Sequence, residues 1–203
     1  WRHKILAAIR ALEGGISFSG IVEADELLMK YSEKGRKFKN KEEYRKAKNK
    51  KHPKVAVLVV TDREGNLLFK QVGEKKVKDE QLREELKSRL SENNLICVKP
   101  KKEFRKGVKG LQSKKVIVNK RQIKRGIYSV KIVENKISDF KTWLSRFHGV
   151  ATKYLQSYLM WFVIMNKYLK ELIDPDIGRL LNLSSHDRWA WDKYREIVSQ
   201  RYE

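Results

Sequence analysis

A continuous run of apolar, mostly β-branched residues constrains this chain more than any other feature. Residues 55–60 read VAVLVV, and such a run without a polar position is typical of a central strand covered on both faces. The turn residues 62–66 (DREGN) lead into residues 67–72, so the two segments are predicted to form a hairpin. A strand of this kind requires packed layers on both sides of its sheet.

Strand and helix patterns alternate along the rest of the chain. The other predicted strands are residues 20–26 (GIVEADE), 95–98 (LICV) and 116–118. The predicted helices, from their apolar spacing, are residues 1–12, 78–90, 134–147, 151–163 and 184–198. Residues 127–133 either extend the sheet or lead into the next helix. The order predicts an α/β fold, a mixed sheet flanked by helices, over residues 1–170, followed by a helical C-terminal extension over 171–203.

Net charge separates this chain from ordinary soluble enzymes. It has 47 Lys and Arg against 25 Asp and Glu, a formal charge of +22, yet its 40% of hydrophobic residues is enough for a packed core. The excess favours a polyanionic partner, because each phosphate that is neutralised releases counterions. Nucleic acid is the first expectation. A ribosome, an anionic membrane surface and a generally lysine-rich composition are the alternatives.

Cysteine content and apolar run length exclude several classes of protein. A single cysteine, Cys97, excludes an internal disulfide framework and a cysteine-rich zinc cluster within these residues. The longest apolar stretch, in residues 158–165, is too short to span a bilayer. We therefore expect no membrane partner and a cytoplasmic location.

A basic insertion at about residues 30–54 interrupts the strand pattern. Its part from residue 34 onward, KGRKFKNKEEYRKAKNKKHPK, has so few apolar residues that we expect a solvated loop or arm. The segment either stays a flexible arm or orders as it clamps DNA. The candidate DNA-binding residues here are Lys34, Arg36, Lys37, Lys39, Arg45, Lys46, Lys50 and Lys51.

Four segments together match a family pattern in order and spacing: WRHKILAAIRAL (1–12), GIVEADE (20–26), SEKGRK (32–37) and RFHGVATKYLQSYLMWF (146–162). The chain resembles the core of a DDE insertion-sequence transposase, in the small zinc-ribbon group related to Merlin elements. The resemblance extends to about residue 170 and is weakest over 71–131. It implies a ribonuclease H-like fold, and a zinc ribbon and DNA-binding region upstream of Trp1.

The resemblance also implies a site and its partners. Three acids in such transposases hold two divalent metals, Mg²⁺ or Mn²⁺, for phosphodiester cleavage and strand transfer. Asp25, at the expected end of the first strand, matches the first acid. Glu134 matches the third and Lys141, seven residues later, matches the lysine that would contact a DNA phosphate. The implied partners are double-stranded DNA, both element ends and target, and a further copy of the chain, in a prokaryotic nucleoid.

The middle acid departs from the family pattern. Lys99 stands directly after residues 95–98, where the family has an Asp. If the three segments meet, Lys99 would pair with Asp25 and Glu134 and oppose metal binding, so cleavage would be impaired. Glu103 is a conceivable substitute acid, although we expect it to face solvent from a following helix. The plainer readings remain a strand-end acid for Asp25 and a first-turn helix acid for Glu134.

Several residues near the end of the matched region are weaker candidates. Arg146, His148 and Lys153 are candidate DNA contacts, and His148 equally fits a helix-capping role. Trp143 and Trp161 lie off the main apolar stripes and are expected to face a partner or another subunit, whereas the stripe of Tyr154, Tyr158 and Phe162 is expected in the core. Asp62 and Glu64 are expected in the turn, not as ligands. The rival function is a non-catalytic, transposase-derived DNA-binding or scaffolding protein.

Overall fold

The computed structural model describes residues 5–6, 15–119, 124–125, 127–168, 192 and 195. The first and last predicted helices (1–12 and 184–198) lie outside the described residues, apart from residues 5, 6, 192 and 195. The C-terminal extension over 171–203 likewise lies outside them. In the part of the chain that the structure describes, no helix is long and apolar enough to cross a membrane.

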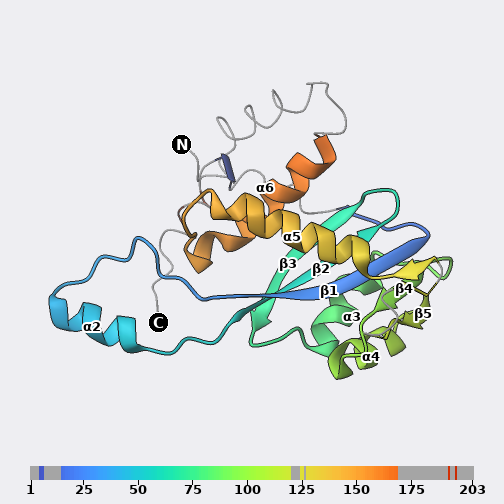
Figure 1. Cartoon of the computed structure of the whole chain (residues 1–203), viewed down its shortest axis with the longest axis horizontal. Helices are drawn as coiled ribbons and strands as arrows, with labels where there is room; N and C mark the ends of the chain where they lie inside the picture. Colours follow the sequence, from blue (N-terminus) through green and yellow to red (C-terminus); the bar gives the residue numbers. More distant parts are fainter. Residues whose placement is uncertain are drawn as a thin grey trace.

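The centre of the molecule is a five-stranded mixed sheet in the order β3-β2-β1-β4-β5 (Figure 1). Its strands are β1 (Ile21–Met29), β2 (Val55–Asp62), β3 (Leu67–Glu74), β4 (Leu95–Val98) and β5 (Lys114–Ile117). β2 runs antiparallel to both β1 and β3, and β4 runs parallel to β1 and β5. The predicted hairpin and the ribonuclease H-like mixed sheet are therefore confirmed.

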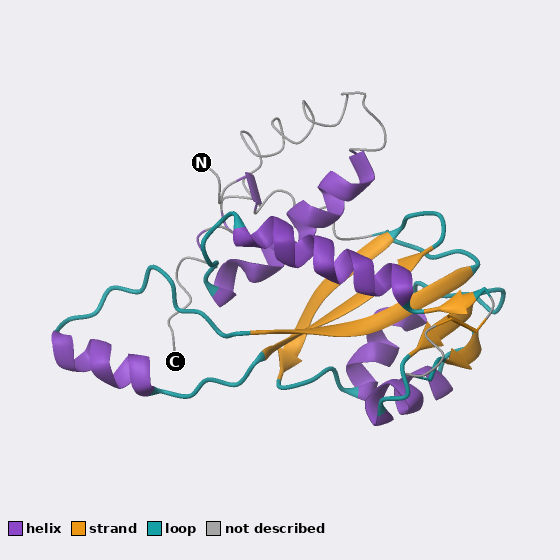
Figure 2. Ribbon diagram, in the orientation of Figure 1, coloured by secondary structure: helices purple, strands orange, loops and turns teal. Residues whose placement is uncertain are grey.

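Helices cover both faces of this sheet (Figure 2). They are α3 (Asp79–Lys87) and α4 (Lys102–Lys109) on one face, and α5 (Lys131–Ser145) and α6 (Leu155–Tyr168) on the other. Every residue of β2 is buried, as the apolar run predicted. Alternate residues of β2 belong to two separate cores. Val57 and Val59 pack in the core between the sheet and α5 and α6, and Leu58 and Val60 pack in the core between the sheet and α3 and α4.

The α3 and α4 helices approach each other closely. Gly107 allows this approach, since a Cβ there would lie 2.6 Å from Leu82 Cδ2 and 3.0 Å from the Asp79 carbonyl oxygen. Phe104 and Val108 of α4 are buried beside it. The inner face of α4 is therefore fixed against α3 and the sheet, and its other face is left to solvent.

The α5 helix is fastened to β1 by a buried carboxylate. Glu23 is 1% exposed and its Oε2 accepts hydrogen bonds from the backbone N–H groups of Ile132 (2.8 Å) and Val133 (3.1 Å). Its Oε1 accepts from Ser129 Oγ at 3.0 Å. Ser129 belongs to β7 (Tyr128–Ser129), which pairs with β6 (Lys124–Arg125) and leads into α5. Free N–H groups at a helix N-terminus and a negative charge stabilise each other.

An aromatic cluster joins α5 to α6, and it corrects one expectation. Trp143 is only 9% exposed and packs against Phe140, Phe162 and Trp161. The expectation that Trp143 faces a partner is therefore wrong. Its position on α5 places it toward α6, and Trp161, partly buried, packs edge-on against it at 5.2 Å.

The basic insertion forms an arm, residues 30–54, that leaves the end of β1 and returns into β2 (Figure 1). The arm holds a helix, α2 (Lys41–Asn49), with no buried residue; the expectation of a solvated loop or arm did not include this helix. Asn40 caps this helix, because its Oδ1 accepts from the Glu43 N–H at 2.8 Å. At the base of the arm the rings of Tyr31 and His52 stack at 4.3 Å, which joins its outgoing and returning segments.

Glu23→Ala is expected to lower the free energy of unfolding by about 2–4 kcal/mol, because it leaves buried N–H and hydroxyl donors unsatisfied. Urea unfolding followed by circular dichroism measures this. Glu92→Ala, at an exposed position, serves as the matched control and should change stability by less than about 0.5 kcal/mol. Equal effects of the two substitutions would contradict the anchoring role of Glu23.

Candidate active site

The register of the sheet brings Asp25 beside the chain that follows β4. Ala24 pairs with Val98, the last residue of β4, so the next residues along the two parallel strands are Asp25 and Lys99. β1 itself continues to Met29. Asp25 therefore lies in the middle of its strand and not at the carboxyl end, because the antiparallel pairing with β2 continues beyond the end of β4.

Three side chains from three elements meet at this point. The Lys99 ammonium contacts Asp25 Oδ2 and lies 2.7 Å from Glu134 Oε1. The Asp25 side chain is 5% exposed, Lys99 24% and Glu134 38%. α5 begins at Lys131, so Glu134 lies within its first turn and does not open the helix as expected. The expectation that Asp25, Lys99 and Glu134 are neighbours is confirmed.

A second cation lies in the same cluster. Lys101 Nζ is 3.2 Å from Asp25 Oδ1 and 2.8 Å from Glu26 Oε1. Glu26 Oε2 also accepts a hydrogen bond from the Val77 N–H at 3.1 Å. Sequence analysis missed both Lys101 and Glu26. The sequence pattern that could have indicated Lys101 is KPK at 99–101, in which two lysines separated by one proline directly follow a buried strand.

The balance of effects at Lys99 keeps its ammonium charged. Burial alone lowers the pKa of Lys99, but hydrogen bonds to Asp25 and Glu134, and the charges of these carboxylates, raise it by more. The net pKa is above the ordinary value for lysine. At neutral pH the cluster therefore contains a fixed positive charge between two carboxylates.

This arrangement does not fit a pair of divalent metal ions. Asp25 and Glu134 already share the Lys99 ammonium, which would repel a cation placed between them. Among the described residues, no three side chains of His, Cys, Asp and Glu are grouped so that they would hold a metal ion. The chemistry that the geometry supports is charge pairing of acids with lysines.

Glu103 has a different partner. It belongs to α4, and its Oε1 contacts Lys76 Nζ. The hydrogen bond from Lys76 lowers the pKa of Glu103. As expected, Glu103 lies on the helix that follows β4 and its side chain is partly exposed, at 26%. It pairs with Lys76 and not with Asp25 or Glu134.

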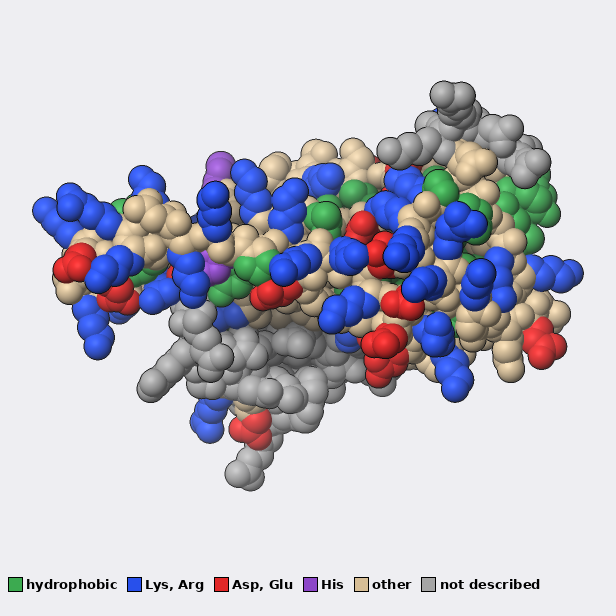
Figure 3. All heavy atoms as spheres, turned by 90° about the horizontal axis from the view of Figure 1, so that it is seen from below, with side chains coloured by type: hydrophobic (Ala, Val, Ile, Leu, Met, Phe, Trp, Pro, Cys, Tyr) green, Lys and Arg blue, Asp and Glu red, His purple; other side chains and the backbone are tan. Residues whose placement is uncertain are grey.

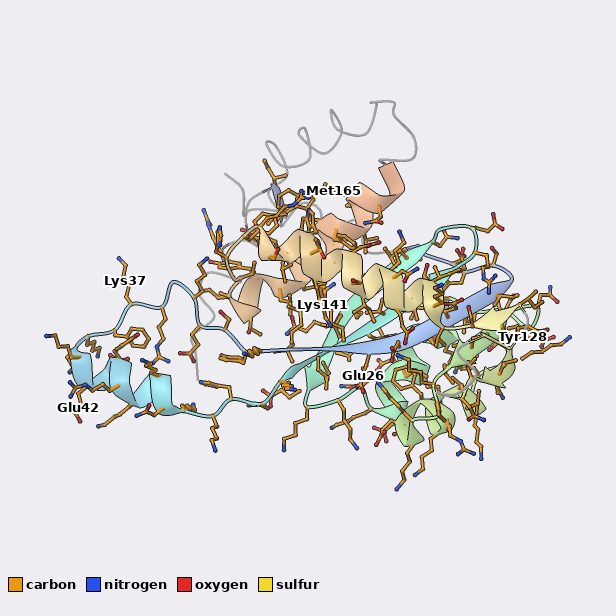
Figure 4. The ribbon with its side chains drawn as sticks, viewed as in Figure 1. Glu26, Lys37, Glu42, Tyr128, Lys141 and Met165 are labelled. Atoms are coloured by element: carbon orange, nitrogen blue, oxygen red, sulfur yellow. The ribbon has the colours of Figure 1, made fainter. Side chains whose placement is uncertain are left out.

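Lys141 and the arm carry separate parts of the predicted DNA-binding set (Figure 4). Lys141 is exposed on α5, two helical turns after Glu134. Lys37 is exposed on the arm, well apart from Lys141. The arm residues Lys39, Arg45, Lys50 and Lys51 are exposed as well.

Three other arm cations have partners within the protein. Lys34 Nζ donates to the carbonyl oxygens of Phe147 (3.1 Å), His148 (2.9 Å) and Gly149 (3.0 Å), so it ties the arm to the end of α5. Arg36 pairs with Glu33 at 2.7 Å and with Glu43 at 3.1 Å. Lys46 pairs with Glu42 at 2.7 Å, with both side chains exposed.

The remaining candidates lie around the end of α5. Arg146 is exposed directly after this helix. His148 has a positive φ of 51° and its backbone N–H donates to the Ser145 carbonyl at 3.0 Å, so its main chain takes part in the helix-ending turn. Lys153 Nζ lies 5.2 Å from the centre of the Tyr154 ring. Asp62, at the end of β2, accepts from the Asn66 N–H at 2.9 Å, which confirms its turn role.

A comparison with protein-family models decides the family. The model of the ISXO2-like transposase domain matches residues 17–164, which include the sheet, the arm and the acid–lysine cluster. The chain belongs to this family. It is thus a DDE insertion-sequence transposase domain, and the mixed sheet flanked by helices is consistent with that family's ribonuclease H-like fold. A search of curated proteins gave no match to the transposase domain.

Lys99→Met is expected to reduce the free energy of unfolding by about 1–3 kcal/mol, since it leaves the poorly exposed Asp25 short of a partner. Urea unfolding measures the loss. Adding Asp25→Asn should recover part of it, because the carboxylate charge that needed Lys99 is gone. Lys87→Met, on an exposed part of α3, is the matched control. Strictly additive losses in the double variant would contradict the Lys99–Asp25 pairing.

Proposed function

We propose that this chain is a DNA transposase core that binds duplex DNA through phosphates and in which Lys99 suppresses metal-dependent cleavage. Lys99 then replaces the middle acid of a DDE-type site, and Asp25 and Glu134 are the first and third acids. The observation that carries this proposal is the position of the Lys99 ammonium, in contact with both carboxylates.

The geometry supports this assignment through convergence of three elements. Asp25 comes from β1, Lys99 follows β4 and Glu134 comes from α5, the arrangement that two-metal phosphodiester chemistry requires of three carboxylates. The ammonium supplies one positive charge where such chemistry depends on divalent cations. Binding of Mg²⁺ or Mn²⁺ is therefore opposed, and cleavage is expected to be very weak or absent.

Charge supports the DNA-binding part. The chain carries +22 overall, and the arm has twelve Lys and Arg against three Glu. The α2 helix buries none of its residues, so its charges do not belong to a core and are available to DNA phosphates. Lys141 is exposed on the same helix as Glu134, which supports a role for it in contacting DNA beside the acidic cluster.

Lys99→Asp is expected to create metal binding, because it restores three carboxylates and removes the competing cation. Mg²⁺ or Mn²⁺ at tenfold above its Kd should then raise the melting temperature by about 3–6 °C, whereas the wild-type protein should show no shift. Differential scanning fluorimetry with and without EDTA measures this. Nicking of a supercoiled plasmid in Mn²⁺ provides a second readout.

The matched control is Lys87→Asp, which makes the same charge change at an exposed position of α3. A metal-dependent shift in this control as large as in Lys99→Asp would point to general electrostatics and not to the site. Absence of any metal response in Lys99→Asp would refute the assignment of Asp25, Lys99 and Glu134 to one DDE-type site.

Duplex binding should weaken steeply with salt, and replacing five exposed arm cations by Gln should flatten that dependence. The five are Lys37, Lys39, Arg45, Lys50 and Lys51. The slope of log Kd against log salt concentration is expected to fall by up to about 4.5 in the variant, because each lost phosphate contact removes about 0.9. Fluorescence anisotropy with a labelled duplex, at salt concentrations from about 50 to about 200 mM, measures it. A salt-independent affinity would contradict phosphate binding.

A further inference from the structure

The outer face of α4 carries a cluster of cations that the proposed site and the arm do not include. Lys102, Arg105, Lys106 and Lys109 are all exposed. Their spacing of three, four and seven residues places them on one side of the helix, opposite the buried Phe104 and Val108. With Pro100 they line a surface hollow of about 240 Å³.

These four cations, here called the α4 stripe, form no ion pair with a carboxylate among the residues that the structure describes, although the charge of Lys102 acts on the neighbouring Glu103. The acid on α4, Glu103, contacts Lys76 instead. In the arm, by contrast, Arg36 and Lys46 are paired with glutamates. Like charges three and four residues apart destabilise a helix, so the α4 stripe has an electrostatic cost that an anionic partner would remove.

The α4 stripe is also rigidly held. The close approach at Gly107 fixes α4 against α3, so the four cations are attached to a firm support. Lys102 to Lys109 extends about 10 Å along the helix axis at 1.5 Å per residue. Phosphates of one DNA strand recur about every 3.4 Å along the duplex axis, so the length of the stripe corresponds to about three intervals between successive phosphates.

The position of α4 relates the stripe to the acidic cluster. Only Pro100 and Lys101 separate Lys99 from the start of α4, and Lys101 contacts Asp25. Figure 3 looks onto the side of the molecule that carries α3 and α4, where Lys and Arg side chains are numerous and acidic side chains lie between them. The arm leaves the sheet elsewhere, beyond the end of β1 (Figure 1).

We propose that the α4 stripe binds the sugar-phosphate backbone of duplex DNA, as a surface separate from the arm. The proposal rests on the proposed function, in which this domain binds DNA. The α4 stripe faces away from the sheet on the side opposite α5, so duplex DNA held there does not depend on the arm.

The first test replaces all four stripe cations by Gln. Duplex affinity at a fixed, moderate salt concentration is expected to fall at least about tenfold, and the salt slope by about 2–4. A matched variant replaces four exposed lysines outside both surfaces, Lys75, Lys78, Lys87 and Lys131, and should change affinity by less than about threefold. Equal losses in the two variants would overturn the proposal. Unchanged thermal unfolding of both confirms that the fold is kept.

The second test uses the fact that the chain has a single cysteine, Cys97. Cys97 is buried, and burial raises the pKa of its thiol to about 11, so it reacts slowly. A cysteine introduced by Lys106→Cys would therefore be the reactive thiol. It would be crosslinked by disulfide exchange to a duplex that carries a mixed disulfide tethered at one phosphate, with release of the small thiol. Glu92→Cys, exposed and outside α4, is the control. Crosslinking from position 106 above that from position 92 supports the proposal, and equal crosslinking refutes it.

The outcomes separate this proposal from the proposed function. If the wild-type chain does not bind duplex DNA, the proposed function fails and the stripe proposal fails with it. If the wild type binds and the stripe variant binds as the matched control does, only the stripe proposal fails. If loss of the α4 stripe weakens binding to single-stranded RNA or anionic vesicles but not to duplex DNA, the partner assignment is wrong.

Discussion

The buried carboxylate of Glu23 is the interaction on which the geometry of the acidic cluster depends. It lies on β1 two residues before Asp25 and holds the first turn of α5, the turn that contains Glu134. Together with Lys99, which contacts both Asp25 and Glu134, this anchor relates the strand to the helix, so the separation of the two acids depends on where Glu23 binds α5. The free N–H groups of a helix N-terminus and a desolvated carboxylate satisfy each other, which explains why an acid is tolerated at 1% exposure.

Lysine in the cluster changes its chemistry without changing the fold around it. Lys99 and Lys101 pair with Asp25, Glu26 and Glu134, so five charged groups nearly balance within a partly buried space. A buried or half-buried carboxylate needs such partners, and an ammonium from the protein provides them without an external ion. The family fold and a site that disfavours divalent metal are therefore compatible in one chain.

Much of the sheet was predictable because its strands are short apolar runs, such as VAVLVV and LICV, that only burial on both faces explains. The position of Asp25 in the middle of β1 was not predictable, because the length of a strand depends on its partners. Here β1 remains paired with β2 beyond the end of β4. The meeting of Asp25, Lys99 and Glu134 followed from the family resemblance. Glu23 and Lys101 were missed because periodicity does not say which polar side chain finds a partner across the fold.

Two other expectations depended on local patterns alone. The arm helix was missed because α2 has no apolar face, and its cap and exposed ion pairs leave only a weak trace in sequence. Trp143 was assigned to a partner surface because it lies off the main stripe, but α6 supplies neighbours for that side of α5.

Both ends of α5 are fastened to one continuous stretch of chain. Glu23 in β1 binds its beginning, and Lys34, in the arm that follows β1, binds the carbonyl groups beyond its end. The helix is thus attached to the strand at one end and to the arm at the other. Sliding of α5 along the sheet would lengthen the hydrogen bonds of Glu23 or those of Lys34, so the two attachments together fix the spacing of Asp25 and Glu134.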